Sequence, residues 1–424
     1  MAKLLRCVMW LTVCLTALSS VGCAQRYGTT SGPTIIVGAV YPLTGPQGAG
    51  GREELAGVRT AVRLINERGG VGGRPVGLDV RDAATPAAGV AAVDALARQH
   101  VPLILGGYSS VMAFEASAEA NRHGTVWWET GAVADDLTMP PGGPVVPYVF
   151  RTVAVGSNLG RMSARFTDEV LLPRWNMSAD RARVVIVYEQ DVYGRSVAAG
   201  ASAEAAARGL KVIDRIPYDP ASFQPTDIAQ RVADARPDFL WDASYLSDGI
   251  ALWRAIAASP VRLKGAIGTS SAFCMPEFGA ALGRLAEGLY ASDKPDADIN
   301  TKALSVDAKV LFDHATTEYQ KVEHHAMGIS ALAGFVGAWA LLHDVAPRAS
   351  SLTADGIKDA AHTIDLPYGS SINGAGLRFG APGSADAGQN QRAASVVWQW
   401  QGGRQRVVYP ASYQTAAPIV AQLP

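Results

Sequence analysis

Cysteine and net charge are both scarce in this chain, and each scarcity excludes a class of protein. The 424 residues hold four cysteines, and Cys7, Cys14 and Cys23 all fall in the N-terminal leader. Cys274 therefore has no partner for an intrachain disulfide, so stability must come from a buried core. Lysine and arginine number 37 against 38 aspartates and glutamates, which argues against a nucleic-acid partner and a basic membrane-surface helix.

The N-terminus resembles a bacterial lipoprotein signal. A short basic start, MAKLLRC, precedes VMWLTVCLTAL, an apolar run too short to span a bilayer. Small residues lead directly to Cys23, although Ser20 stands where leucine is usual. We expect residues 1–23 to be a signal peptide, Cys23 to carry lipid, and 24–33 to be a flexible tether. Cleavage elsewhere by an ordinary signal peptidase is the alternative, and both imply export to the periplasm or the outer face of a membrane.

Apolar runs alternate with amphipathic stretches from residue 34 onward. TIIVGAVY, VPLILGG and TVWWE have the composition of buried parallel strands, and residues 52–68 have helical spacing of their apolar side chains. The alternation starts again at RVVIVYE, and VVWQWQGGRQRVVY near the end predicts a β-hairpin. The pattern predicts an α/β fold with two doubly wound parallel-sheet lobes.

One later stretch, HHAMGISALAGFVGAWALLHD, is apolar almost all round. Polar and charged residues bracket fewer than about 18 apolar positions, which is short for a membrane span. We therefore expect a buried helix within a lobe.

The glycine-rich segment TGPQGAGG lies between a predicted strand and a predicted helix, where a dinucleotide-binding loop would lie. Its order does not match G-x-G-x-x-G, and Pro46 removes an amide donor from the middle of it. We expect a tight, bare loop there and no nucleotide or other cofactor.

Two further motifs give weak indications, one of a catalytic serine and one of a metal site. GTSSA, residues 268–272, misses the last glycine of the hydrolase pattern G-x-S-x-G, yet a serine hydrolase using Ser270 stays an alternative. Glu323, His324 and His325 are adjacent, and adjacent helical side chains point in different directions, so we expect no metal site.

Five loops follow predicted strands, where ligands bind open parallel sheets. The loops GYSS (107–110) and ETGA (129–132) offer hydroxyls and main-chain amides that suit a carboxylate. The loops EQDVY (189–193), DASY (242–245) and GTSS (268–271) add tyrosines and acids, which suit the apolar and ammonium parts of a small zwitterion. Together they predict a cleft between two lobes.

These blocks resemble the branched-chain amino-acid (Leu/Ile/Val) substrate-binding proteins of ABC importers, which have the type I periplasmic-binding fold. TGPQGAGGREELAGVRTAVRLINERGGVGGRPV is similar to the family's N-terminal signature, and LGGYSS, ETGAVADDLT, YEQDVYGRSVA, PDFLWDASYLSDGIALWRA and GLRFG follow in the family's order. The resemblance covers residues 34–412. It implies a three-strand hinge joining lobe one, at 34–153 and 292–397, to lobe two, at 154–291 and 398–424.

The resemblance also implies a ligand site without catalytic residues. Ser109 and Ser110 would contact a ligand carboxylate, and Tyr193 and Tyr245 would be pocket tyrosines from lobe two. The expected ligand-binding residues are Tyr108, Ser109, Ser110, Thr130, Gly131, Ala132, Val133, Asp191, Tyr193, Asp242, Tyr245 and Ser270.

The chain departs from the family at two points of this site. Thr269, Ser270 and Ser271 stand where amino-acid binders place a glutamate for the ligand ammonium, and a buried ammonium without a counter-charge costs several kcal/mol. Gly50 stands where relatives often carry an aromatic wall. The ligand is then an amide, an aromatic acid or a short dicarboxylate, or else another acid compensates. The candidate acids are Glu129, Asp191, Asp242 and Asp248.

The resemblance implies an exported, monomeric solute-binding lipoprotein rather than an enzyme. It would capture a small amino acid, or a related carboxylate or amide, and deliver it to an ABC permease. A ligand sensor feeding a membrane receptor and a module for cell-wall fragments are the alternatives that use the same fold.

Overall fold

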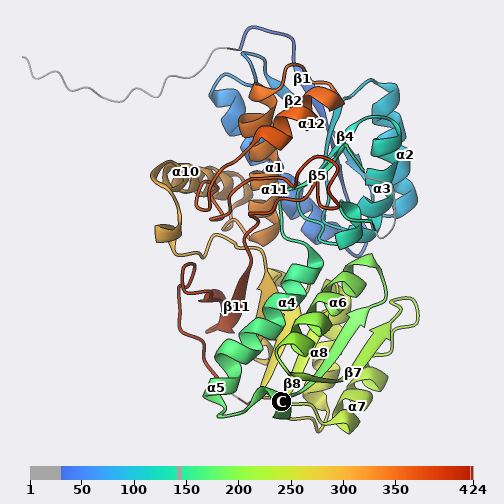
Figure 1. Cartoon of the computed structure of the whole chain (residues 1–424), viewed down its shortest axis with the longest axis vertical. Helices are drawn as coiled ribbons and strands as arrows, with labels where there is room; N and C mark the ends of the chain where they lie inside the picture. The colour runs from blue at the N-terminus through green and yellow to red at the C-terminus, as the bar shows by residue number, and fades with distance from the viewer. Residues whose placement is uncertain (1–29, 141–145, 421, 424) are drawn as a thin grey trace, which may run out of the picture.

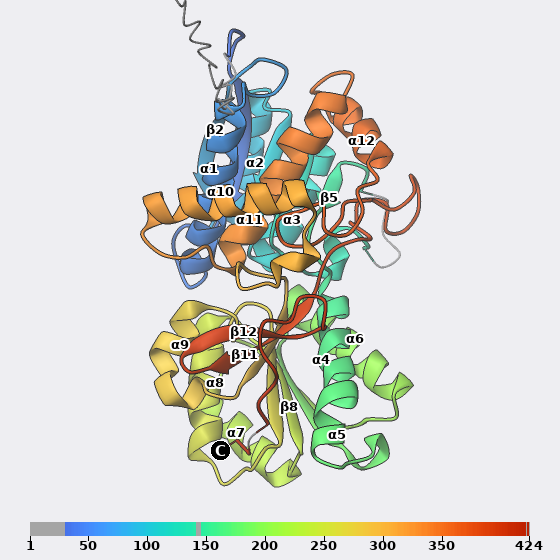
Figure 2. The same cartoon turned by 90° about the vertical axis from the view of Figure 1, so that its left-hand side faces the viewer.

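A computed structural model describes residues 30–140, 146–420 and 422–423 and folds them into two α/β lobes (Figures 1 and 2). The predicted signal peptide, the lipidation site Cys23 and most of the predicted tether lie outside the described residues. Figure 1 shows both lobes built from a sheet with helices packed on its faces.

The first lobe is built on a five-stranded parallel sheet with the order β2-β1-β3-β4-β5. Its strands are mostly continuous apolar runs because both faces are covered by helices. The strands are β1 (Ile35–Tyr41), β2 (Val76–Asp82), β3 (Leu103–Gly106), β4 (Val126–Glu129) and β5 (Val149–Arg151). The helices are α1 (Gly48–Glu67), α2 (Pro86–Arg98), α3 (Ser110–Arg122), α10 (Val306–Glu323), α11 (Ile329–Trp339) and α12 (Ala354–Thr363).

The second lobe is built on a seven-stranded sheet with the order β12-β11-β10-β9-β8-β6-β7. Strands β6 to β10 are parallel, and the predicted hairpin is confirmed as the antiparallel pair β11–β12. The strands are β6 (Arg183–Glu189), β7 (Lys211–Tyr218), β8 (Phe239–Ala243), β9 (Gly265–Thr269), β10 (Tyr290–Asp293), β11 (Val396–Gln401) and β12 (Arg404–Tyr409). The helices are α4 (Gly156–Phe166), α5 (Leu172–Arg174), α6 (Val192–Ala207), α7 (Pro225–Ala235), α8 (Leu246–Ala258) and α9 (Pro276–Leu282).

The chain crosses between the sheets after β5, after β10 and before β11, so the predicted α/β fold with two lobes and a threefold connection is confirmed (Figure 2). Two amides tie the first crossing to the third: Gln389 Nε2 donates to Val153 O and Asn390 Nδ2 to Thr152 O, each at 2.9 Å. Fully buried Arg151 donates to Gln389 Oε1 at 2.7 Å. The lobe boundaries given above stay a prediction.

The apolar stretch around α11 is buried in lobe one. A π-helical segment, Ala340–Val345, and a 3₁₀ turn, Ala346–Arg348, continue α11. Within the described residues, Ile329–Arg348 is the one helical stretch long and apolar enough to cross a membrane, yet 89% of its most apolar window is buried. This burial agrees with the prediction of a core helix.

The predicted glycine loop before residue 52 is shorter than expected and ends at Gln47. Helix α1 begins at Gly48, so Gly50 and Gly51 belong to its first turn. A Cβ on Gly51 would lie 1.9 Å from Pro42 O, and the bare backbone therefore lets the helix start directly against the end of β1. The periodicity of the sequence begins only at the first apolar side chain, which hid this turn.

Helices α1 and α11 approach so closely that Gly57 has no room for a side chain, because a Cβ there would lie 1.8 Å from Ala331 O. Helix propensity alone would favour alanine at this position. We expect Gly57→Ala to destabilise the fold by about 1–3 kcal/mol, measured by urea unfolding, because α11 must shift. Gly328→Ala is the control, since its Cβ would find its nearest neighbour at 3.6 Å. Equal stability of Gly57→Ala and the natural chain would contradict this packing.

Candidate functional site

A small cavity between the lobes collects residues from both. Its volume of about 10 Å³ holds roughly one water molecule. Lobe one contributes Glu54, Tyr108, Gly131, Ile329 and Ser330. The other side is lined by Ser270, Ser271, Cys274, Met275, Asp293 and Lys294.

Three lining residues hold a strained backbone. Tyr108, Ser270 and Ser271 have φ values of 68°, 57° and 48°, in the left-handed region that residues with a side chain rarely adopt. Such strain costs about 1–3 kcal/mol per residue and gathers at ligand sites, where surrounding structure maintains it. The strain comes from both sides of the cavity, which marks the place where the lobes meet as the candidate site.

The ring of Tyr108 takes the space above Gly50. A Cβ on Gly50 would lie 1.9 Å from Tyr108 Cζ, and the tyrosine hydroxyl reaches across to Met275 Sδ at 3.9 Å. The aromatic wall that is missing at Gly50 is therefore supplied by the loop after β3.

The amides of the loop after β4 are already bonded within the protein. Glu129 Oε1 accepts from Gly131 N at 2.9 Å and Ala132 N at 2.7 Å. Ser110 Oγ accepts from Val133 N and Ala134 N, both at 3.2 Å, and Ser109 Oγ caps α3 through Met112 N. Burial raises the pKa of Glu129 to about 7, although these amides lower it. These amides are therefore occupied, whereas no acceptor is found for the Ser110 hydroxyl proton within the described residues.

A buried acid from α1 lies behind this loop. Thr130 Oγ1 donates to Glu54 Oε1 at 2.5 Å, and Tyr41 bonds Thr130 at 2.8 Å. Burial and the neighbouring Glu129 raise the pKa of Glu54 well above its usual range.

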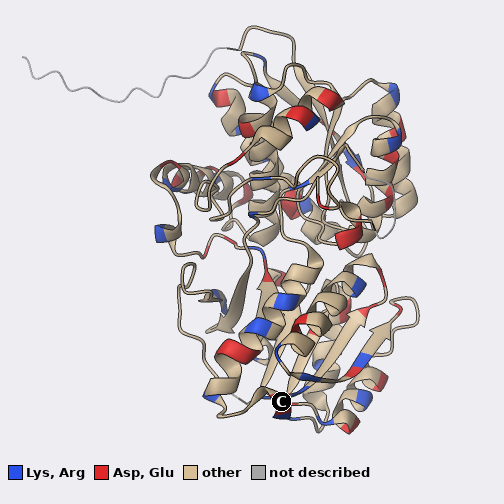
Figure 3. Ribbon diagram, in the orientation of Figure 1, with Lys and Arg blue, Asp and Glu red and all other residues tan. Residues whose placement is uncertain are grey.

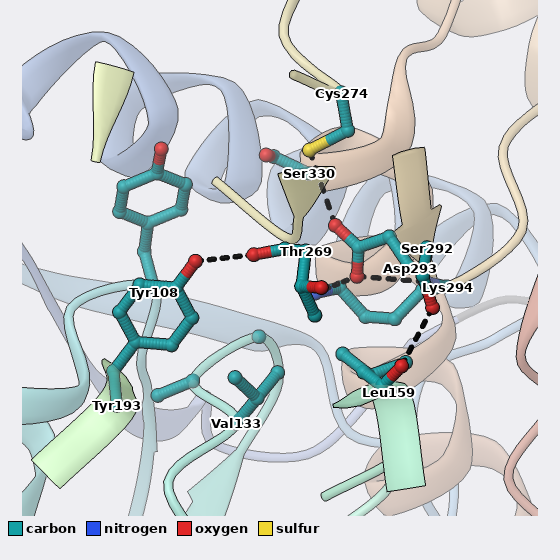
Figure 4. Close-up of polar contacts among 12 residues, drawn as sticks. Tyr108, Val133, Leu159, Tyr193, Thr269, Cys274, Ser292, Asp293, Lys294 and Ser330 are labelled. Atoms are coloured by element: carbon teal, nitrogen blue, oxygen red, sulfur yellow. Dashed lines mark hydrogen bonds and ion pairs between the residues drawn. The ribbon is translucent and has the colours of Figure 1, made fainter. Parts of the chain in front are cut away.

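On the opposite side, Asp293 lies between a thiol and an ammonium (Figure 4). Cys274 Sγ donates to Asp293 Oδ2 at 3.1 Å and Lys294 Nζ to Asp293 Oδ1 at 2.9 Å. The pKa of Lys294 is raised because Asp293 outweighs the opposing effect of burial. This ion pair gives the cavity its one lining lysine.

Two predicted tyrosines pack together in lobe two. The rings of Tyr193 and Tyr245 lie 5.0 Å apart, and the Tyr193 hydroxyl donates to Thr269 O, the bond drawn in Figure 4. Tyr245 Oη is buried and has no hydrogen-bond partner among the described residues. Burial raises the pKa of Tyr245, and the carboxylates of Asp191 and Glu189 raise it further.

Four acids stand at the carboxyl ends of β6 and β8, and we name them the lobe-two acids: Glu189, Asp191, Asp242 and Asp248. Asp191 caps α6 through Gly194 N at 2.7 Å, and Ser244 Oγ donates to Asp242 Oδ1 at 2.7 Å. Burial raises the pKa of Glu189 to about 8, of Asp242 to about 7 and of Asp191 to about 6. Burial raises the pKa of Asp248 as well.

The structure brings only part of the predicted site to the cavity. Tyr108, Gly131 and Ser270 line it, whereas Ser109, Ser110, Thr130, Ala132 and Val133 lie in the supporting loops and Asp191, Tyr193, Asp242 and Tyr245 lie in lobe two beside it. As ligand contacts they stay predictions.

Sequence analysis missed Glu54, Asp293 and Lys294. Glu54 left a signal, since it is an acid on the apolar face of a predicted helix. The four-residue strand β10, which ends at Asp293, left none.

Within the described residues, no histidine forms a hydrogen bond with Ser270. The histidine hydrogen bonds there go to Asp94, Ala326, Asp344 and Gly380. The described part of the chain holds one group of acids and histidine close enough to share a metal, namely Asp94, Glu119 and His123 on α2 and at the end of α3. That group lies outside the cavity lining.

Comparison with known proteins gives consistent matches. The model of the family described as periplasmic binding protein matches residues 34–404. Leu/Ile/Val-binding protein homolog 8 of Brucella abortus is 27% identical over 376 residues, which are 88% of this chain and 90% of the relative.

Two solved structures show the same fold at low identity. The branched-chain amino acid transporter substrate-binding protein LivJ of Streptococcus pneumoniae, in complex with isoleucine, has a TM-score of 0.72 at 19% identity and covers 89% of this chain and 100% of its own. A solute-binding protein of an ABC transporter from R. palustris, in complex with benzoate, has a TM-score of 0.69 at 16% identity, covering 91% and 98%.

The raised pKa values of the lobe-two acids make stability depend on pH. An acid whose pKa is higher in the folded state stabilises the fold below its usual pKa of about 4, and this contribution is lost as pH rises through the folded value. For Asp242 and Glu189 the loss is complete once the pH has passed about 7 and about 8. We expect unfolding free energy to fall between about pH 5 and pH 8.5 in urea titrations, and Asp242→Asn to reduce that fall. Asp227→Asn, at an exposed position of α7, is the control; an unchanged slope in Asp242→Asn would contradict the assignment.

Proposed function

Because the chain belongs to the periplasmic binding protein family, in the group of branched-chain amino-acid binding proteins, we propose that it captures a small solute between its lobes and delivers it to an ABC importer. The observation that carries the proposal is the cavity lined from both sides and strained at Tyr108, Ser270 and Ser271. The facing loops must move apart to admit a solute, because the cavity holds roughly one water molecule. A solute bound between them contacts both lobes, so it stabilises the closed form by its difference in affinity for the two states.

The solute is an amino acid or a related carboxylate or amide. The solved relatives named above were crystallised with isoleucine and with benzoate, so the fold accepts ligands with and without an ammonium group. In this chain Tyr108 forms the aromatic wall and Ser270 and Ser271 offer hydroxyls, while Lys294 and Asp293 provide both signs of charge.

We further propose that the protein works as an exported monomer anchored by lipid on Cys23. Family membership supports export, and the small residues before Cys23 support the anchor. A membrane tether keeps the binding protein close to its permease, which raises the effective concentration of the loaded form.

The test is a thermal-shift screen of amino acids, amides and aromatic acids against residues 30–424. A solute at about 100 times its Kd adds about 2.7 kcal/mol to stability. We expect Ser330→Leu to abolish the shift because the added atoms fill the small cavity, whereas Thr317→Leu, on the exposed side of α10, should retain it. A full shift in Ser330→Leu would show that the solute binds elsewhere.

A further inference from the structure

The lobe-two acids form a group of buried carboxyl groups at one edge of the lobe-two sheet. Glu189 ends β6 and Asp242 lies on β8, the neighbouring strand, where Asp242 is in register with Val187. Asp191 caps α6 and Asp248 lies in the first turn of α8. All four therefore stand at one edge of the sheet, where ligands of parallel sheets bind.

Three of these carboxyl groups each have one buried oxygen without a hydrogen-bond partner in the described structure. Glu189 is 6% exposed and Asp242 2% exposed, yet Glu189 Oε2, Asp242 Oδ2 and Asp191 Oδ2 have no hydrogen-bond partner among the described residues. The ion pairs described in lobe two lie elsewhere, for example between Arg208 and Asp168 and between Lys264 and Asp238. A buried carboxylate oxygen without a donor is costly, which indicates that a donor is supplied from outside the chain.

The aromatic side chains around the acids suit the same guest. The Tyr193 and Tyr245 rings pack beside them, and the buried Tyr245 hydroxyl is unpaired in the described structure. Tyr218 donates to Asp248 Oδ2 at 3.4 Å. Carboxylates combined with tyrosine faces favour ammonium and guanidinium groups, through ion pairing and cation–π attraction.

A ligand carboxylate would find few unpaired hydrogen-bond donors at this site. The amides of Gly131, Ala132 and Val133, which a ligand carboxylate would need, already bond Glu129 and Ser110. The lining lysine, Lys294, already pairs with Asp293, and Glu54 adds another acid. The site therefore offers more unpaired acceptors than donors.

We propose that the captured solute is a small organic cation, an amine or guanidine, and that Asp242 and Glu189 receive its positive group. This inference rests on the proposed function and names the class of its solute. Thr269, Ser270 and Ser271 lack the glutamate that would pair with a ligand ammonium. The proposal assigns that role to the acids of β6 and β8 instead. The lobe-two acids are too widely spaced for a metal ion, because no three of them bring ligand atoms within 4.8 Å of one another in the described structure. An ammonium or guanidinium spans wider gaps with several N–H donors.

The experiment compares cations with neutral molecules of the same shape. Thermal shift and calorimetric titration would use butylguanidine against butylurea and putrescine against 1,4-butanediol, with the broader screen of amino acids, amides and aromatic acids run in parallel. Calcium and magnesium chloride are added as metal probes. We expect the cationic member of a pair to bind and its neutral partner to bind at least about tenfold more weakly, as expected for loss of a charge-assisted hydrogen bond.

Asp242→Asn separates binding from folding. This variant should weaken the cation by about tenfold or more while remaining folded and becoming more stable near pH 8.5, because an unpaired buried charge is removed. A residue with a purely structural role would lose stability and affinity together. Asp227→Asn removes one charge from an exposed position of the same lobe and should bind normally.

The remaining outcomes each overturn the inference. If other solutes bind but cations and neutral partners behave alike, the class is wrong and the proposed function stands. If calcium or magnesium alone shifts the midpoint, the acids hold a metal. If Asp242→Asn binds the cation unchanged, the acids are not the receiving group. If no compound in either set binds, the proposed function fails together with the inference.

Discussion

The hydrogen bonds of Gln389 and Asn390 to the segment after β5 hold two of the crossing segments together at the hinge. These bonds join the first and third crossings at Val153 and Thr152, and Arg151 anchors the same network through Gln389. All four polar residues of this network are buried, so each bond replaces water that the interior excludes. Because the crossings are short, small rotations there move whole lobes, and the facing loops meet only if this network holds.

Much of the fold follows from sequence because parallel strands covered on both faces are continuous apolar runs. TIIVGAVY and RVVIVYE became β1 and β6, and QGGR became the turn between β11 and β12. The first turn of α1 was hidden because Gly50 and Gly51 carry no side chains to show a period. The four-residue strand β10 is too short for a period of its own and is defined by pairing with β9 and β11. Both misses concern backbone that other segments position.

The candidate site was predictable at the level of loops and less so at the level of atoms. Strand ends identify the loops, since ligands bind there, but they do not say where each amide points. Glu129 is the last residue of β4, and its carboxylate turns back to take the amides of Gly131 and Ala132. The pairing of Asp293 with Lys294 and Cys274 depends on a crossing segment far from the motif blocks. Figure 3 shows acids and bases mixed over both lobes, so overall charge gave no hint of a local excess.

The unpaired carboxylates of lobe two bear on how the empty molecule behaves. Closure of the lobes without a solute removes water from these oxygens and supplies no hydrogen-bond donor in its place. The empty protein therefore favours the open state. A cationic solute would shift this equilibrium toward the closed state. Under the proposed function, the conformation that the importer meets then depends on occupancy, and the same carboxyl groups that bind the solute disfavour docking of the empty protein.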